Sequence, residues 1–121
     1  MPMIRHVEIP VDDLDRAIAF YARVFDVVLD EVVADGYRMA LFPLDAQQPG
    51  AGCALVKGDV YRTGKAGALI YFGVERLENT LRRVEDTGGR MLYPPTTVGD
   101  WGRVAEFEDS EGNRIGLHEA G

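Results

Sequence analysis

Two histidines and one carboxylate are the residues of this chain whose types and spacing could best do chemistry. His6 and Glu8 lie two residues apart in an alternating apolar and polar stretch over 3–11. Side chains alternate between the two faces of a strand, so both should project from the same face. A histidine has an ordinary pKa of about 6.5, so His6 and Glu8 could act as a proton-transfer pair at neutral pH. The plainer interpretation is a polar pair that orients a ligand or satisfies itself.

A second group of polar residues lies near the end of the chain. Arg114 and His118 should share one face of an apolar stretch over 114–118, with Gly116 between them. Together with His6 and Glu8, His118 gives two imidazoles and one carboxylate, which is the donor set of a facial triad of metal ligands. The alternative is that His118 is a hydrogen-bonded pocket residue near a fraying end of the chain.

Two aromatic residues are further candidates for ligand contacts. Tyr71 offers both a ring and a hydroxyl, and core packing explains it equally well. Trp101 is the only tryptophan and lies in a segment over 94–102 whose glycines could let it move as a lid or a stacking wall. It could equally fill the edge of the core or a dimer interface. The single Cys53 cannot form an internal disulfide, and its apolar strand predicts a buried, unreactive thiol.

An internal repeat predicts the elements that position these residues. At an offset of 63, residues 7–14 lie over residues 70–77, and each segment is followed by a helical pattern. Later segments match in the same order, 38–42 with 103–107 and 53–56 with 115–118. Each half therefore predicts one βαβββ unit, over about 1–57 and 68–121, joined by a small and polar linker over 58–67.

Periodicity and turn residues give the expected bounds of each element. The first unit should contain a strand over 3–11, a helix that begins after Asp12 or Asp13 and buries Leu14, Ala17, Ile18, Tyr21 and Phe25, and strands near 27–33, 37–42 and 52–57. The second should contain a strand over 68–74, a helix over 77–87, strands over 90–93, 103–108 and 114–118, a loop over 94–102 and a hairpin turn over 109–113.

Composition limits the class of protein. A chain of 121 residues with 46% hydrophobic residues can bury a single core, so we expect one domain. The sequence has no apolar run long enough to cross a bilayer and no secretory signal pattern, so we expect a cytoplasmic protein. A formal net charge of -7 argues against nucleic acid and anionic membranes as partners. The chain also lacks a phosphate-binding glycine loop, paired cysteines and a nucleophilic serine elbow.

The segments over 6–21 and 107–115, with the duplicated units, resemble the vicinal oxygen chelate superfamily. That group includes glyoxalase I, extradiol dioxygenases, fosfomycin resistance proteins and bleomycin-binding proteins. Within it, the chain is most similar to small bacterial proteins described as related to lactoylglutathione lyase. The resemblance implies an α+β fold in which two βαβββ modules form a half-closed, cup-shaped mixed β-sheet flanked by helices. It covers the single domain predicted over 1–121.

The resemblance also implies where a catalytic metal would be held, since the family's ligands come from the first and last strands of each module. The internal repeat places these positions at His6, Ala54, Leu69 and Gly116, and only His6 has a ligating atom. We therefore expect no metal and no other cofactor. The remaining alternative is a divalent metal at a shifted site, where His6, Glu8 and His118 could converge inside the cup.

Two functions stay open after these arguments. The favoured one is metal-independent binding of a small organic molecule in an apolar cup. Its expected contacts are His6, Glu8, Tyr71, Trp101, Arg114 and His118. The alternative is a divergent lyase or isomerase that uses a shifted metal or His6 and Glu8 as acid and base, so whether the chain is an enzyme is left undecided. Resemblance to the drug-binding members implies a homodimer, with modules paired within a chain or swapped between two.

Overall fold

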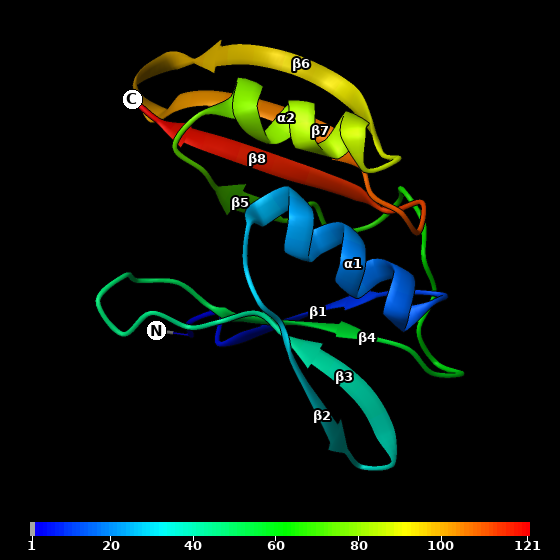
Figure 1. The fold of residues 1–121 in the computed structure, drawn as a ribbon. Coiled ribbons are helices and arrows are strands. Elements are labelled where there is room, and N and C mark those ends of the chain that lie inside the picture. Colours follow the sequence, from blue (N-terminus) through cyan, green and yellow to red (C-terminus); the bar gives the residue numbers. More distant parts are fainter. Residues whose placement is uncertain (1) are drawn as a thin grey trace.

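A computed structural model describes residues 2–121, which form two successive βαβββ units (Figure 1). The first unit consists of β1 (His6–Pro10), α1 (Leu14–Phe25), β2 (Asp30–Ala34), β3 (Tyr37–Leu41) and β4 (Gly52–Val56). The second consists of β5 (Tyr71–Gly73), α2 (Leu77–Asp86), β6 (Arg90–Val98), the short 3-10 helix η1 (Gly99–Trp101), β7 (Gly102–Glu108) and β8 (Arg114–Ala120).

Each unit forms its own four-stranded mixed sheet. The strand orders are β1-β4-β3-β2 and β5-β8-β7-β6, so the first strand of each unit lies at a sheet edge beside the last. These two pairs, β1 with β4 and β5 with β8, are parallel, while the remaining pairs are antiparallel. The predicted α+β class and the two βαβββ units are confirmed. The two sheets are not closed on each other into one sheet.

Both helices bury one face, but the predicted face of α1 is partly corrected, because Ile18 and Phe25 are only half-buried and Phe20 and Val24 are buried. Asp13 caps α1, and its carboxylate accepts the backbone N–H of Arg16 at 3.0 Å. The helix ends at Asp26, whose φ of 54° is left-handed. The buried residues are Leu14, Ala17, Phe20, Tyr21 and Val24 in α1, and Leu77, Thr80, Leu81 and Val84 in α2.

One core joins the two units. In Figure 1, α1 lies between the two sheets, and α2 lies across the second sheet. The ring of Phe20 packs on Phe107 with centroids 6.1 Å apart, and Phe25 packs on Phe72 at 4.6 Å, so α1 contributes to the hydrophobic surface of the other unit. Residues from both sheets complete the cluster, among them Ile9, Leu55, Ile115 and Leu117.

Strand alternation then defines the opposite side of each sheet, which we call the open face. Because Ile9 and Leu55 point into the core, His6 and Glu8 on β1 and Ala54 and Val56 on β4 belong to the open face of the first sheet. By the same alternation, the open face of the second sheet carries Tyr71 on β5 and Arg114, Gly116 and His118 on β8.

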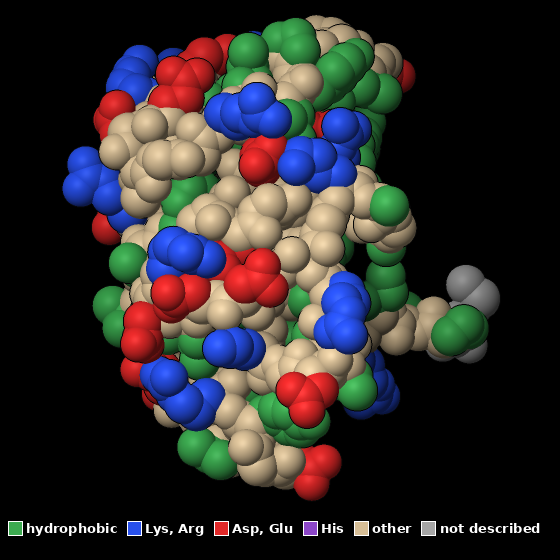
Figure 2. Space-filling model, turned by 90° about the vertical axis from the view of Figure 1, so that its right-hand side faces the viewer, with side chains coloured by type: hydrophobic (Ala, Val, Ile, Leu, Met, Phe, Trp, Pro, Cys, Tyr) green, Lys and Arg blue, Asp and Glu red, His purple; other side chains and the backbone are tan. Residues whose placement is uncertain are grey.

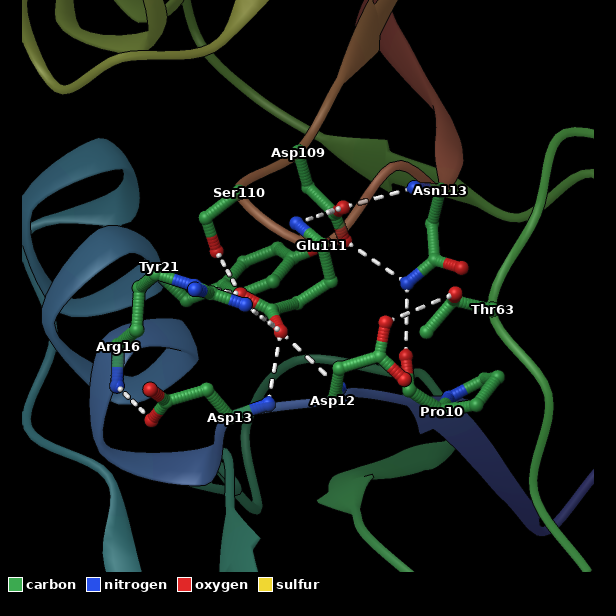
Figure 3. Close-up of polar contacts among 10 residues, drawn as sticks. All are labelled: Pro10, Asp12, Asp13, Arg16, Tyr21, Thr63, Asp109, Ser110, Glu111 and Asn113. Atoms are coloured by element: carbon green, nitrogen blue, oxygen red, sulfur yellow. Dashed lines mark hydrogen bonds and ion pairs between the residues drawn. The ribbon is translucent and has the colours of Figure 1, made fainter.

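The turn between β7 and β8 ties the second unit to the start of α1 (Figure 3). The carboxylate of Glu111 accepts the backbone N–H groups of Asp12 and Asp13, both at 2.9 Å. It also accepts hydrogen bonds from Nε of Arg16 at 2.7 Å and from Nη2 at 2.9 Å. Burial alone would raise the pKa of Glu111, but the hydrogen bonds from Arg16 and the backbone outweigh burial and hold the pKa at about 2.

A second set of contacts in the same turn orders the buried side of the connection. Asp109 accepts the hydroxyl of Tyr21 at 2.6 Å and the backbone N–H groups of Glu111 and Asn113 at 2.8 Å each. Asn113 donates its side-chain N–H to the carbonyl of Pro10 at 2.7 Å. This turn therefore holds the end of β1 and the side chain of Tyr21 on α1, which lie 103 and 88 residues away in the sequence (Figure 3).

Several predicted bounds are corrected. The first strand begins at His6 instead of residue 3, and β2 begins at Asp30 instead of residue 27. The loop predicted over 94–102 is wrong, because β6 continues to Val98 through two shifts of its register with β7. A bulge absorbs the two prolines at a sheet edge, where a missing N–H is tolerated.

The segment over 58–67 is fastened to the fold rather than extended as a loose spacer. Gly64 donates its backbone N–H to Oδ1 of Asn113 at 3.0 Å, and Nζ of Lys65 lies 3.1 Å from Oε1 of Glu108. The Thr63 hydroxyl lies 3.3 Å from Oδ2 of Asp12. The linker therefore contacts both units.

Candidate functional site

The predicted pair on β1 is present and has a third member. Nε2 of His6 lies 3.3 Å from Oε2 of Glu8, and the hydroxyl of Tyr61 donates to Oε1 of Glu8 at 2.9 Å. The side chains of His6 and Glu8 are 48% and 32% exposed, so a ligand in solvent could reach both. The hydrogen bond to Glu8 raises the pKa of Tyr61 above its ordinary value, because the phenol must stay protonated to donate.

Tyr61 is a residue that the sequence did not single out. Its backbone N–H donates to the carbonyl of Gly58 at 3.1 Å, which turns the chain back after β4. The ring then meets the ring of Tyr37 edge to face, with centroids 6.2 Å apart and an interplanar angle of 85°. The only nearby residue in the sequence that could have pointed to Tyr61 is Gly58. In the structure, a Cβ at position 58 would overlap the ring of Tyr37.

A separate aromatic cluster lies on the open face of the second sheet. The ring of Trp101 stacks on His118 with centroids 4.0 Å apart, and Tyr71 meets Trp101 edge to face at 5.6 Å. Nε2 of His118 also lies 2.7 Å from the carbonyl oxygen of Trp101. His118 is therefore engaged with the tryptophan, which itself remains 51% exposed.

The two units share a cavity of about 430 Å³ that brings Glu8 and Arg114 to one place. Ile9, Ile70 and Ile115 supply apolar walls, while Arg62 and Lys65 reach it from the linker. Arg114 is paired with Glu106, with Nη1 and Oε1 3.0 Å apart. The cavity thus combines hydrophobic surface with charged groups from both units.

The remaining predicted residues do not converge. His6 contacts Glu8, whereas His118 contacts Trp101 on the other sheet. Over residues 2–121, no three His, Cys, Asp or Glu side chains are grouped so that they could hold a metal ion. The predicted contact residues therefore divide into a polar group on the first sheet, an aromatic group on the second, and Arg114 at the cavity between the units.

The four positions that the resemblance assigns to metal ligands can be tested against the structure. Glu8 and Ala54 are register partners on the first sheet, and Tyr71 and Gly116 on the second. A Cβ at Gly116 would stand 2.6 Å from the ring of Tyr71, so the ring occupies the space that a ligating side chain would need. With Ala54 and Leu69 also lacking donor atoms, this set does not fit a catalytic divalent metal.

Cys53, predicted to be buried, is half-buried on the helix side of the first sheet, away from the open face. Burial raises the pKa of its thiol to about 12. It lines a cavity of about 610 Å³ together with Phe25, Phe42 and Phe72. A thiol with so high a pKa is a poor nucleophile, as the sequence predicted.

Comparison with known proteins identifies the family to which this chain belongs. The chain belongs to the Glyoxalase/Bleomycin resistance protein/Dioxygenase superfamily, whose family model matches residues 3–117. It is similar to the probable lactoylglutathione lyase of Synechocystis sp., with 26% identity over 119 residues that cover 93% of this chain and 91% of that protein.

Two solved structures support the fold. A glyoxalase/bleomycin resistance protein from Albidiferax ferrireducens matches with a TM-score of 0.74 and 17% identity, over 99% of this chain and 100% of that one. A mutant of the fosfomycin resistance protein FosX from Listeria monocytogenes, complexed with Mn(II) and 1S,2S-dihydroxypropylphosphonic acid, matches with a TM-score of 0.70 and 22% identity. That match covers 100% of this chain and 92% of the FosX chain.

The charged surface and the length of the helices concern two partners that the net charge argued against, nucleic acid and anionic membranes. Figure 2 shows basic and acidic side chains interspersed over one face of the molecule, without a large area of a single sign. Neither helix within residues 2–121 is long and apolar enough to span a membrane. The face drawn in Figure 2 therefore carries no continuous basic patch.

Proposed function

We propose that this chain binds a small organic molecule without a metal, in the cavity between its two units. The observation that carries the proposal is that cavity of about 430 Å³, lined by Glu8 and Arg114 and by isoleucines of both units. Ligand sites typically enclose roughly 300–1,000 Å³ and combine apolar walls with a few polar groups. The polar groups would orient the ligand, while Ile70 and Ile115 would contact its hydrophobic part.

The donor set supports independence from metal. The FosX relative was solved with Mn(II) and a phosphonic acid. In this chain the positions that the resemblance assigns to ligands are His6, Ala54, Leu69 and Gly116, and one imidazole alone binds a divalent metal weakly. Binding energy here would come from apolar burial and from hydrogen bonds to Glu8 and Arg114.

A fragment screen followed by NMR tests this proposal. Small oxygenated organic molecules would be screened against the ¹⁵N-labelled protein, in the presence of a chelator. We expect saturable binders that shift the amide signals of Ile70 and Ile115 and that weaken at least tenfold in Arg114→Gln. Arg82→Gln, an exposed arginine on α2, is the matched control. Binders that shift signals elsewhere, or that bind Arg114→Gln unchanged, would contradict the proposal.

A second candidate is catalysis by the His6 and Glu8 pair. The specific observation in its favour is the 3.3 Å contact between Nε2 and Oε2, which would let the carboxylate orient an imidazole that moves a proton. Since a relative is described as a probable lactoylglutathione lyase, that activity is the first to assay, with and without added zinc or nickel. Turnover lost in His6→Ala would favour this candidate over simple binding.

We also propose that the chain forms a homodimer in the cytoplasm. Its support is the exposure of large apolar side chains in both units, with Trp101 51% exposed and Met3 and Ile4 79% and 77% exposed. Tryptophan and methionine are enriched in protein interfaces. Sedimentation equilibrium measures the mass directly, and a monomer at all concentrations would contradict the dimer.

A further inference from the structure

Tyr61 places a phenol against Glu8 although the linker that carries it is outside both sheets. Its side chain starts beside Gly58, just after β4, and ends at the carboxylate of Glu8, whose register partner is Ala54. The phenol therefore runs back along the open face of β4, above a strand whose Ala54 and Val56 are fully buried. Part of the open face of the first sheet is covered by the chain's own aromatic side chain.

The contacts of this phenol are those that a bound hydroxyaryl molecule would make. The hydroxyl donates to Oε1 of Glu8 at 2.9 Å, the other carboxylate oxygen faces His6, and the ring meets Tyr37 edge to face. A carboxylate with one oxygen next to His6 and the other free to accept a hydrogen bond favours a neutral O–H donor and repels an anion. The glycine at position 58 keeps the ring of Tyr37 close, since a Cβ there would overlap it.

The linker has attachments to the fold that do not depend on the phenol of Tyr61. On its far side the linker is held through Gly64 to Asn113 and through Lys65 to Glu108, and these contacts do not involve Tyr61. Between β4 and Gly64, the Tyr61 hydroxyl is a side-chain contact to the first sheet that water can reach, because Glu8 is 32% exposed. Displacing the Tyr61 side chain therefore breaks its contacts with Glu8 and Tyr37 but leaves these attachments of the linker intact.

From these contacts we propose that Tyr61 is an intramolecular occupant of a binding site for phenols. A hydroxyaryl ligand displaces Tyr61, donates its hydroxyl to Glu8 and packs its ring against Tyr37. This proposal rests on the ligand-binding function proposed above and adds a ligand class at a neighbouring position, which shares Glu8 with the cavity although neither Tyr37 nor Tyr61 lines it. The apparent affinity of the wild-type protein is then lowered by the fraction of time that Tyr61 occupies the site.

The probe for this site is p-cresol, which is the tyrosine side chain as a free molecule, and toluene is the matched probe without a hydroxyl. Calorimetric or NMR titrations would compare the wild type with Tyr61→Phe and Tyr61→Ala. We expect one-to-one binding of p-cresol that is at least tenfold tighter in Tyr61→Ala than in the wild type, with Tyr61→Phe between them. Toluene should bind Tyr61→Ala more weakly than p-cresol does. Tyr93→Ala, an exposed tyrosine on β6, should behave like the wild type.

Several outcomes would overturn the proposal. They are no gain of p-cresol binding in Tyr61→Ala, equal binding of toluene, and binding unchanged when Glu8→Ala is added to Tyr61→Ala. In the wild type, p-cresol must also shift the ring signals of Tyr61, which are assigned by their absence in Tyr61→Phe. Fragments that bind beside Ile70 and Ile115 when p-cresol fails would leave the general binding function intact and refute only the phenol site.

Discussion

The turn that holds Glu111 makes a strong quantitative prediction about stability. In Glu111→Gln the amide has one acceptor oxygen where the carboxylate had two, so the backbone N–H groups of Asp12 and Asp13 and the guanidinium of Arg16 compete for it. The carboxylate has a pKa of about 2 instead of about 4.5. A tenfold change in proton affinity corresponds to about 1.4 kcal/mol, so the charged form contributes at most about 3 kcal/mol. Because the side chain of Arg16 is 54% exposed, solvent screening lowers our expectation to about 2 kcal/mol.

The sign of the pH dependence follows from the lowered pKa. The folded state binds the proton less tightly than the unfolded state, so the stabilisation is fully present above about pH 4.5 and is lost as the pH falls through about 2. Glu111→Gln cannot titrate at this position. The difference in stability between the wild type and this variant should therefore shrink as the solution is acidified.

Urea denaturation measures this difference directly. At about pH 7, Glu111→Gln should lose about 2 kcal/mol of unfolding free energy, and the loss should fall below about 1 kcal/mol near pH 2. Glu85→Gln, an exposed carboxylate on α2, is the control and should stay within about 0.5 kcal/mol of the wild type. A difference that is equally large at both pH values would refute the assignment of the stabilisation to the charge of Glu111.

Three further predictions concern the open face of the second sheet and the core. Gly116→Ala should displace the ring of Tyr71, which its Cβ would approach to 2.6 Å, and lower stability by roughly 1–3 kcal/mol, measured by urea denaturation. His118→Ala should free the ring of Trp101, so its fluorescence should shift to the red and be quenched more easily by acrylamide; an unchanged spectrum would contradict the stacking. With its pKa raised to about 12, Cys53 should react with a thiol reagent at about pH 8 far more slowly in the folded protein than in urea, and equal rates would contradict its burial.

Much of the fold could be predicted from the sequence because its signals are local. The apolar spacing of Leu14, Ala17 and Tyr21 and the capping residue Asp13 specify α1, and the repeat specifies the second unit by analogy with the first. The segment over 94–102 escaped prediction, because Pro94 and Pro95 suggest a loop and only pairing with β7 at a sheet edge makes them part of β6.

The candidate site was predictable only where strand alternation decides it. His6 and Glu8 share a face because they are two residues apart on one strand, and the structure brings them together. Tyr61 could not be predicted, because its contact with Glu8 spans 53 residues and depends on how the linker turns at Gly58. His118 was grouped with His6 by residue type, whereas its stacking on Trp101 depends on the fold of the second unit.

A calorimetric titration with divalent metals tests the central claim that this family member works without a metal. The untagged protein, freed of metal by a chelator, would be titrated with nickel, zinc, manganese and ferrous ions, with His6→Ala and His118→Ala as comparisons. Our account predicts no stoichiometric binding above that of the two variants, because Ala54, Leu69 and Gly116 supply no ligand. One-to-one binding that either substitution abolishes would contradict it and make a metal-dependent enzyme the better explanation.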